Sequence, residues 1–84
     1  MNVENIEAVV RQLLIDEFNI AAEKITATTR LAQDLALDSF DIVSLISLLE
    51  VEFNQELEKE KLLQVIAVQN IVDLIRQALM ASSK

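Results

Sequence analysis

The sequence predicts an all-α protein: a small four-helix bundle of three long helices and one short helix, with a long loop between helices 1 and 2. Three observations predict it. The 84 residues contain neither glycine nor proline, which the tight turns of antiparallel sheets need. Leucine, isoleucine, valine, alanine and glutamate fill most positions, and the apolar residues recur at helical intervals. The length suits a single domain over residues 1–84.

The first helix is expected over residues 3–18. Asn2 is a suitable N-cap, and Glu4 lies in the first turn, where a carboxylate favours the helix dipole. Asn19 can take the left-handed conformation that ends a helix. One apolar stripe is formed by Val3, Ile6, Val10, Leu13, Leu14 and Phe18.

Residues 19–37 lack a sustained apolar period and contain three threonines, so they predict a long connection. Long ordered loops in small domains are often functional. The residues expected to hold this loop on the core are Ile20, Ile25, Leu31, Leu35 and Leu37.

The helical pattern returns at Asp38, a suitable N-cap, and Asp41 stands three residues on, where a capping box places its acid. Asn54 is a natural stop. The expected buried stripe contains Phe40, Val43, Leu45 or Ile46, Leu49 and Phe53, widened by Ile42, Leu48 and Val51. Because apolar residues cover most of its circumference, we expect this helix to be the central one.

Residues 59–64 permit a short third helix or turn, and a last helix is expected over about 68–80, with a frayed tail within residues 79–84. The apolar face of the last helix contains Val68, Ile71, Val72, Ile75 and Leu79.

A formal net charge of −7 disfavours nucleic acids and anionic membranes as partners and favours basic patches on other proteins. The absence of cysteine excludes disulfides and thiolate chemistry and fits a reducing compartment. No apolar run reaches the length of a membrane span, and Glu4 and Glu7 are unlike the basic start of a signal peptide. We expect a cytoplasmic monomer.

Catalysis is not predicted. A nucleophilic serine needs a general base, and the chain has no histidine. Asp38 and Asp41 could in principle act as acid and base or bind Mg²⁺. The chain has no glycine with which to form a phosphate-binding loop. We predict neither a catalytic site nor a metal site. Ser39 is either an ordinary first-turn residue or a residue whose hydroxyl is modified by a different protein. Helix N-terminal amides suit an attached phosphate.

The segment "DLALDSFDIVSLISLLEVEF" (34–53) resembles the second-helix signature of acyl carrier proteins, D-L-G-x-D-S-L-D followed by an apolar helix. The resemblance covers nearly the whole chain. The first helix of that family is similar to "IEAVVRQLLIDEFNI" (6–20), its long loop to "TATTRLAQDL" (26–35) and the start of its fourth helix to "AVQNIVDLI" (67–75).

The resemblance implies a non-catalytic carrier. A Mg²⁺-dependent phosphopantetheinyl transferase would move 4′-phosphopantetheine from coenzyme A onto Ser39, and the thiol of the arm would carry acyl groups as thioesters. Asp38 would help the transferase recognise the site. Docking onto basic patches of acyl-transferring or condensing enzymes would involve residues on the second helix: Phe40, Asp41, Ser44, Glu50 and Glu52.

A core of aliphatic side chains could open to admit an acyl chain at modest cost. The residues that could line such a pocket are Val43, Ile46, Leu49, Ile66 and Ile71. Ordinary packing within the bundle explains the same residues equally well.

Several positions depart from the family pattern. Ala36 replaces the usual glycine before the attachment serine, and Phe40 replaces the usual leucine after it. Ser44 replaces an acidic residue and Ser47 an apolar one. The remaining departures are Lys59, Lys61, Ala67 and Asn70. Together they thin the acidic docking face and favour a specialised carrier in a dedicated lipid or secondary-metabolite pathway over a general fatty-acid carrier. A peptidyl or D-alanyl carrier and an unmodified helical interaction module remain the alternatives.

Overall fold

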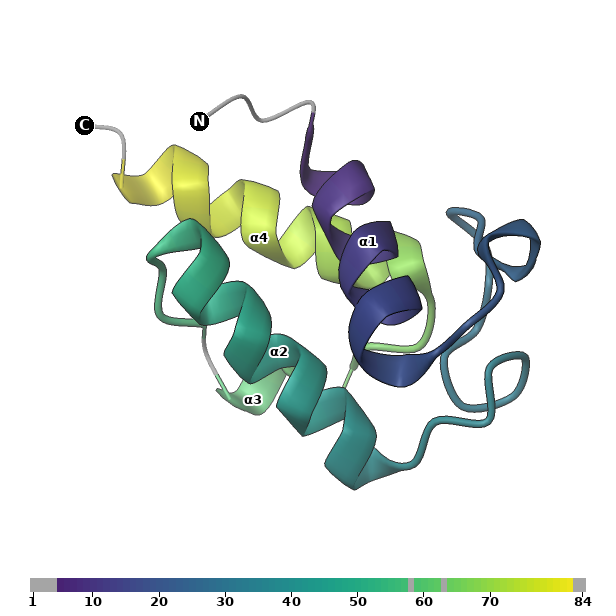
Figure 1. Ribbon diagram of the computed structural model, residues 1–84. Coiled ribbons are helices and arrows are strands. Elements are labelled where there is room, and N and C mark those ends of the chain that lie inside the picture. Colours follow the sequence, from purple (N-terminus) through teal and green to yellow (C-terminus); the bar gives the residue numbers. More distant parts are fainter. Residues whose placement is uncertain (1–4, 58, 63, 83–84) are drawn as a thin grey trace.

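Helices make up the regular secondary structure of the described residues, apart from one isolated β-bridge between Arg30 and Ala67. The computed structural model describes residues 5–57, 59–62 and 64–82. Along the chain lie α1 (Ile6–Phe18), the 3₁₀ turn η2 (Ala22–Lys24), α2 (Ser39–Phe53), α3 (Lys59–Leu62) and α4 (Val68–Ser82) (Figure 1). None of the helices in these ranges is both long and apolar enough to cross a bilayer. The chain is thus a small helical domain.

Two asparagines end the long helices as predicted. Asn19 (φ 56°, ψ 39°) closes α1 and Asn54 (φ 53°, ψ 47°) closes α2 in the left-handed conformation, which asparagine tolerates better than most residues. The start of α1 differs from the prediction, because the described helix begins at Ile6. The expected cap Asn2, together with Glu4, lies outside the described residues.

The core lies where α1 packs against α4 and α2. The buried face of α1 consists of Ile6, Val10 and Leu14. The connection between α1 and α2 also contributes, as predicted, with four buried apolar residues and a half-buried Ile20. The buried four are Ile25, Leu31, Leu35 and Leu37. This connection is therefore fixed to the body of the domain at several points.

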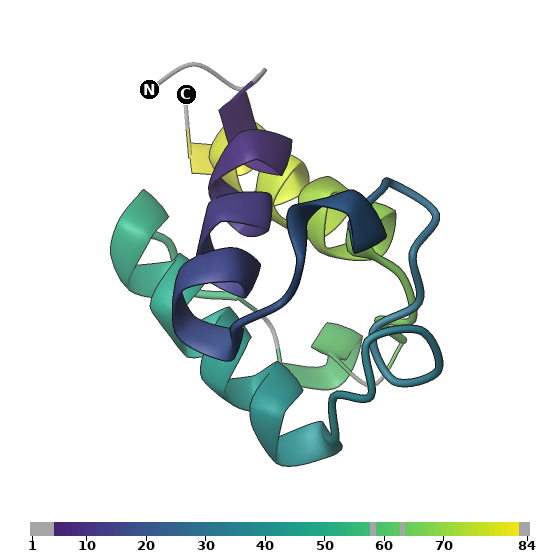
Figure 2. The same ribbon diagram turned by 45° about the vertical axis from the view of Figure 1, so that its right-hand side comes forward.

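The prediction that α2 is the central helix, buried on most sides, is wrong. Its buried residues are Leu45, Ile46, Leu49 and Phe53. Four residues assigned to its buried stripe are instead exposed: Phe40 (78%), Val43 (54%), Leu48 (36%) and Val51 (81%). Because α2 packs on one side only and turns 100° per residue, apolar residues on its far side face solvent. In both views α2 lies at the edge of the molecule (Figures 1 and 2).

Backbone hydrogen bonds join the α1–α2 connection to the start of α4. The N–H of Val68 donates to the carbonyl of Thr29 (3.0 Å), and the N–H of Gln69 donates to that of Ala27 (2.9 Å). The first N–H groups of a helix have no partner within the helix. The connection therefore caps α4, and α4 holds the connection in place.

Helix α4 is longer than predicted. It continues through Ser82, whereas the sequence suggested an end near residue 80 and a frayed tail within residues 79–84. Ala78 and Leu79 are half-buried against the core, so packing continues into the region expected to fray. Alanine, the best helix former, also favours the extension at Ala81. Residues 83 and 84 lie outside the described residues.

Candidate functional site

Ser39 is the first residue of α2 and follows a complete capping box. The Asp38 carboxylate accepts the N–H of Asp41 (2.8 Å), and the Asp41 carboxylate accepts the N–H of Asp38 (3.2 Å). The capping box predicted from the sequence is therefore confirmed. Ser39 itself is exposed, and its hydroxyl forms no hydrogen bond within the described part of the chain. The oxygen is thus available to an approaching enzyme.

Buried leucines fix the backbone on the N-terminal side of Ser39. Leu35 and Leu37 are both buried, and the N–H of Leu37 donates to the carbonyl of Leu31 (3.0 Å). Leu45 and Ile46 anchor the other side within α2. The views of Figures 1 and 2 place the first turn of α2 at one end of the molecule. Ser39 therefore sits at an exposed tip with a fixed backbone on both sides.

Ala36 makes the turn that leads into this tip. Its φ is 59°, in the left-handed region that costs a residue with a Cβ about 1–2 kcal/mol relative to glycine. The sequence comparison with the family pattern identified this position as one where alanine replaces glycine. The backbone retains the conformation that glycine favours, so the substitution places strain beside the site.

The electrostatics of the first turn suit an attached phosphate ester. The N-terminal amides of α2 give this end of the helix a partial positive charge. The carboxylates of Asp38 and Asp41 add negative charge, but both are held by backbone N–H groups of the capping box. No group of three or more acidic side chains in the described residues is arranged to hold a metal ion.

The predicted docking residues are not all available on one surface. Phe40 is exposed beside Ser39, Ser44 is half-exposed and Glu52 is exposed. The Asp41 carboxylate, in contrast, belongs to the capping box. Glu50 is half-buried, and its Oε2 accepts the N–H of Leu57 (2.8 Å) in the turn after α2.

An uncharged surface, which we call the outer stripe, runs along the solvent side of α2. Its members lie at helical spacings of three and four residues: Phe40, Val43, Ser44, Ser47, Leu48 and Val51. Leu48 and Val51, which the sequence assigns to the buried stripe, are exposed, and so is Ser47, which was not predicted as a docking residue. A helical wheel of residues 39–53 places them away from the core once Leu45 and Leu49 are known to be buried. The sequence alone does not show that these two leucines, and not other apolar residues of the helix, face the core.

The residues predicted to line an acyl pocket are divided between the core and the surface. Ile46, Leu49 and Ile71 are almost completely buried, whereas Val43 and Ile66 are exposed. Ile66 borders a surface cavity of about 280 Å³ together with Ile42 from the first turn of α2. The cavity is lined by Arg30, Ala32, Gln33, Ile42, Val65 and Ile66.

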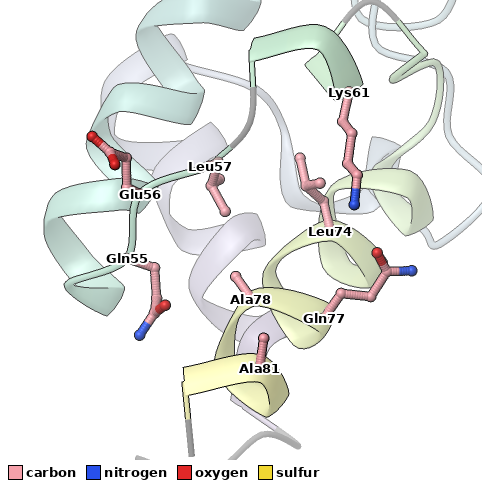
Figure 3. A pocket seen from close by; sticks show the side chains of 8 residues that line it. All are labelled: Gln55, Glu56, Leu57, Lys61, Leu74, Gln77, Ala78 and Ala81. Carbon is pink, nitrogen blue, oxygen red and sulfur yellow. The ribbon is translucent and has the colours of Figure 1, made fainter.

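A second cavity, of about 340 Å³, lies between α4 and the segment that follows α2 (Figure 3). Leu57 and Leu74 point toward it from opposite sides, and Lys61 extends from α3 toward α4. Its walls also include Gln55, Glu56, Gln77, Ala78 and Ala81. None of the predicted pocket residues lies here.

Comparison with known proteins assigns the family. The family model described as "Phosphopantetheine attachment site" matches residues 8–75. The acyl carrier protein of Buchnera aphidicola subsp. Baizongia pistaciae (strain Bp) is 36% identical over 75 residues, which cover 89% of this chain and 96% of that protein. The matched range includes all of α2 and the capping box before it. The chain is therefore a carrier of covalently attached 4′-phosphopantetheine and not itself a catalyst, and it belongs to the acyl carrier protein family.

Proposed function

We propose that 4′-phosphopantetheine is attached to Ser39 and that the protein carries acyl intermediates as thioesters on this arm. The observation that supports the proposal is the exposed, unbonded hydroxyl of Ser39 at the first position of α2, directly after the capped Asp38. The short helix α3 would complete a four-helix carrier arrangement, with the α1–α2 connection as its long loop.

Loading requires that Ser39 Oγ attack a phosphorus of the coenzyme A pyrophosphate. The Oγ–P bond forms, the P–O bond to the adenosine bisphosphate breaks, and the serine proton passes to a base of the transferase. This chain supplies the oxygen and holds it in place, because the buried leucines and the capping box fix the backbone around it.

When bound, the arm supplies a thiol that forms thioesters. The chain contains no cysteine, so this thiol would be the only one in the protein. A single thiol avoids competition for acyl groups and avoids internal disulfides. We further propose that the protein works as a cytoplasmic monomer with a phosphopantetheinyl transferase and with acyl-transferring or condensing enzymes.

The first experiment is intact-mass measurement after incubation with coenzyme A, Mg²⁺ and a broad-specificity phosphopantetheinyl transferase. The wild type should gain the mass of one arm, and Ser39→Ala should gain none. Ser47→Ala is a matched control, because Ser47 is another exposed serine of α2, and it should be loaded like the wild type. An unmodified wild type beside a loaded reference carrier would favour the unmodified interaction module.

The pathway is a separate part of the proposal. The serines at positions 44 and 47 and the internal use of Glu50 leave α2 with little acidic surface, which supports a dedicated lipid or secondary-metabolite pathway. General fatty-acid synthesis enzymes should then use the loaded protein poorly compared with an acidic carrier. Efficient turnover by those enzymes would contradict a specialised role, and efficient loading with an amino acid would point to a peptidyl or D-alanyl carrier.

A further inference from the structure

The peptide group between Ile66 and Ala67, just before α4, is held at both of its polar ends. Its N–H, which belongs to Ala67, donates to Oδ1 of Asn70 (2.8 Å). Its carbonyl, which belongs to Ile66, accepts the N–H of Leu31 (2.9 Å) in the α1–α2 connection. Because a peptide group is planar and rigid, a side chain that holds one end also restricts the direction of the other. Asn70 therefore helps to set the direction in which the carbonyl of Ile66 points.

The same side-chain oxygen also holds the preceding peptide group. Asn70 Oδ1 accepts the N–H of Ile66 (3.0 Å) as well, so two successive N–H groups before α4 end on one atom. Asn70 stands three positions after Ala67, where a capping box places the side chain that accepts the N–H of the N-cap residue. Ala67 has no side-chain oxygen for the other half of such a box. The segment before α4 thus depends on Asn70.

The hydrogen bonds continue from Leu31 to the turn before Ser39. The carbonyl of Leu31 accepts the N–H of Leu37 (3.0 Å), and Leu37 stands two residues before Ser39. Between the two leucines lies Ala36, with a positive φ of 59°. A residue in this conformation persists only where the surrounding structure holds it there, and the bond from Leu37 to Leu31 is one such support. The turn that leads to Ser39 therefore depends on contacts outside it.

We propose that Asn70 is a positioning residue for the loading of Ser39, acting through the hydrogen-bonded chain that joins it to the turn before α2. The inference rests on the proposed function. Transfer to Ser39 Oγ needs this oxygen in line with a phosphorus atom, and a small displacement of the oxygen slows such a reaction strongly. Asn70 itself lines a cavity of about 290 Å³ that is formed by α3, α4 and the link between them. We therefore expect it to act through backbone positions and not by contact with the reacting groups.

Amide hydrogen exchange of the unloaded protein, followed by NMR, tests the hydrogen-bonded chain. Asn70→Ala removes the acceptor of two N–H groups, so the N–H of Leu37 should exchange about fivefold faster, as expected for the loss of one net hydrogen bond. Alanine is a better helix former than asparagine, so the N–H of the buried Ile75 in the middle of α4 should change by less than about twofold. If Leu37 keeps its wild-type rate, or if both amides accelerate equally, the inference is wrong.

Two further variants show whether the side-chain oxygen of Asn70 is responsible. Asn70→Asp keeps an acceptor for both N–H groups and should retain the wild-type exchange rate of Leu37. Gln69→Ala is the matched control, because it removes a neighbouring amide side chain that donates to Asp73 (2.8 Å) and not to the segment before α4. It should also leave the exchange of Leu37 unchanged. If either variant accelerates Leu37 as much as Asn70→Ala does, the oxygen of Asn70 is not the cause and the inference fails.

The rate of loading measures whether this support matters for the reaction. With a phosphopantetheinyl transferase in excess, the single-turnover rate should fall about threefold in Asn70→Ala, because the hydroxyl of Ser39 is held less firmly. The Kd of the transferase for the unloaded protein should stay within about twofold of the wild type, because the substitution leaves the surface of α2 unchanged. Asn70→Asp should restore the rate. Circular dichroism and thermal unfolding establish that each variant is folded.

The outcomes separate this inference from the proposed function. If the wild type and Asn70→Ala are loaded at the same rate, the carrier function stands and the positioning role of Asn70 is overturned. A fall in the Kd-corrected rate together with faster exchange of Leu37 supports both. A wild type that gains no arm removes the proposed function and, with it, any role of Asn70 in loading.

Discussion

Ala36 adopts a left-handed backbone conformation (φ 59°) three residues before Ser39. Ala36→Gly removes the Cβ strain of about 1–2 kcal/mol and adds about 0.5–1 kcal/mol of chain entropy lost on folding. The net effect should be a stabilisation of about 0.5–1 kcal/mol. Urea unfolding followed by circular dichroism measures it.

Ala32→Gly is the matched control for this prediction. Ala32 is exposed in the same connection and does not have a positive φ. Glycine there relieves no strain and should lower the free energy of unfolding by about 0.5–1 kcal/mol. The two Ala→Gly substitutions should thus change the free energy of unfolding in opposite directions. If both destabilise, Ala36 carries no strain.

Asp34 shows how one turn of the connection fixes a carboxylate. The N–H of Arg30 donates to its Oδ2 (2.8 Å), and the guanidinium lies 3.2 Å from Oδ1. The backbone N–H of Arg30 and, secondarily, its side chain lower the pKa of Asp34 below the ordinary value. Because the folded-state pKa is depressed, the associated stability is present above the unfolded pKa and is lost as the pH falls through the folded one.

A carboxyl-carbon NMR titration should therefore find the pKa of Asp34 below its ordinary value. In Arg30→Gln the guanidinium is lost but the backbone N–H, the larger cause, remains. The pKa should rise only part of the way and stay below the ordinary value. Complete return to the ordinary value would show that the side chain, and not the backbone, holds the carboxylate.

At the scale of elements, Asp38 caps the first turn of α2, and recognition by the transferase is a second role that we propose for it. Asp38→Ala removes the acceptor of the Asp41 N–H (2.8 Å) and should cost about 1 kcal/mol of stability. Asp38→Asn keeps an acceptor and should stay within about 0.5 kcal/mol of the wild type.

Loading rates of these two variants separate the roles of Asp38. If the transferase recognises the carboxylate, Asp38→Asn should be loaded slowly although it is stable. Normal loading of Asp38→Asn together with slow loading of Asp38→Ala would mean that Asp38 acts only through the cap.

Helix ends were predictable because their signals are local. The capping box of Asp38 and Asp41 and the left-handed asparagines at positions 19 and 54 depend on residues within one turn. The start of α4 at Val68 also agrees with the prediction, but part of its cap does not follow from neighbouring residues. Asn70 Oδ1 accepts the N–H of Ala67 (2.8 Å) within the same turn, whereas the N–H of Val68 donates to the Thr29 carbonyl (3.0 Å), a partner far away in sequence.

The orientation of α2 could not be predicted for a different reason. Apolar residues occupy most of its circumference, so several rotations about the helix axis bury a similar apolar stripe. Packing selects the rotation that buries Leu45 and Leu49 and exposes Phe40 and Val51. The position of Ser39 followed from local sequence, whereas the choice of which apolar residues α2 exposes depends on tertiary contacts.

The burial of a polar residue, Thr29, could not be predicted from the sequence either. It is one of three threonines in a four-residue stretch, and it is the buried one. Its Oγ1 donates to the carbonyl of Lys24 (2.9 Å) and accepts the N–H of Thr26 (2.8 Å). The composition of the stretch indicated a loop but gave no means of choosing which threonine turns inward.

At the scale of the whole molecule, the net charge of −7 opposes the folded state through self-repulsion. The ion pairs Arg30–Asp34 and Arg76–Asp73 are both substantially exposed, so their loss in salt should cost little. Raising NaCl from about 0.01 M to 0.5 M, which shortens the Debye length several-fold, should therefore raise the Tm by several degrees.

Scanning calorimetry at constant buffer composition measures this shift. Choline chloride at the same ionic strength should give a similar increase if general screening is the cause. A Tm that falls with salt would show that specific ion pairs stabilise the protein more than its net charge destabilises it.

The exposure of Phe40 also has a spectroscopic consequence. The chain contains three phenylalanines and no tyrosine, tryptophan or histidine, so only three rings contribute to its aromatic proton spectrum. Phe53 is buried, Phe18 is packed against the core, and Phe40 is largely in solvent beside Ser39. The ring of Phe40 should resonate near its random-coil position, and it should be the one that shifts and broadens when another protein covers the arm. The protein thus contains its own reporter of docking, which can be followed with a deuterated partner whose aromatic protons do not overlap it.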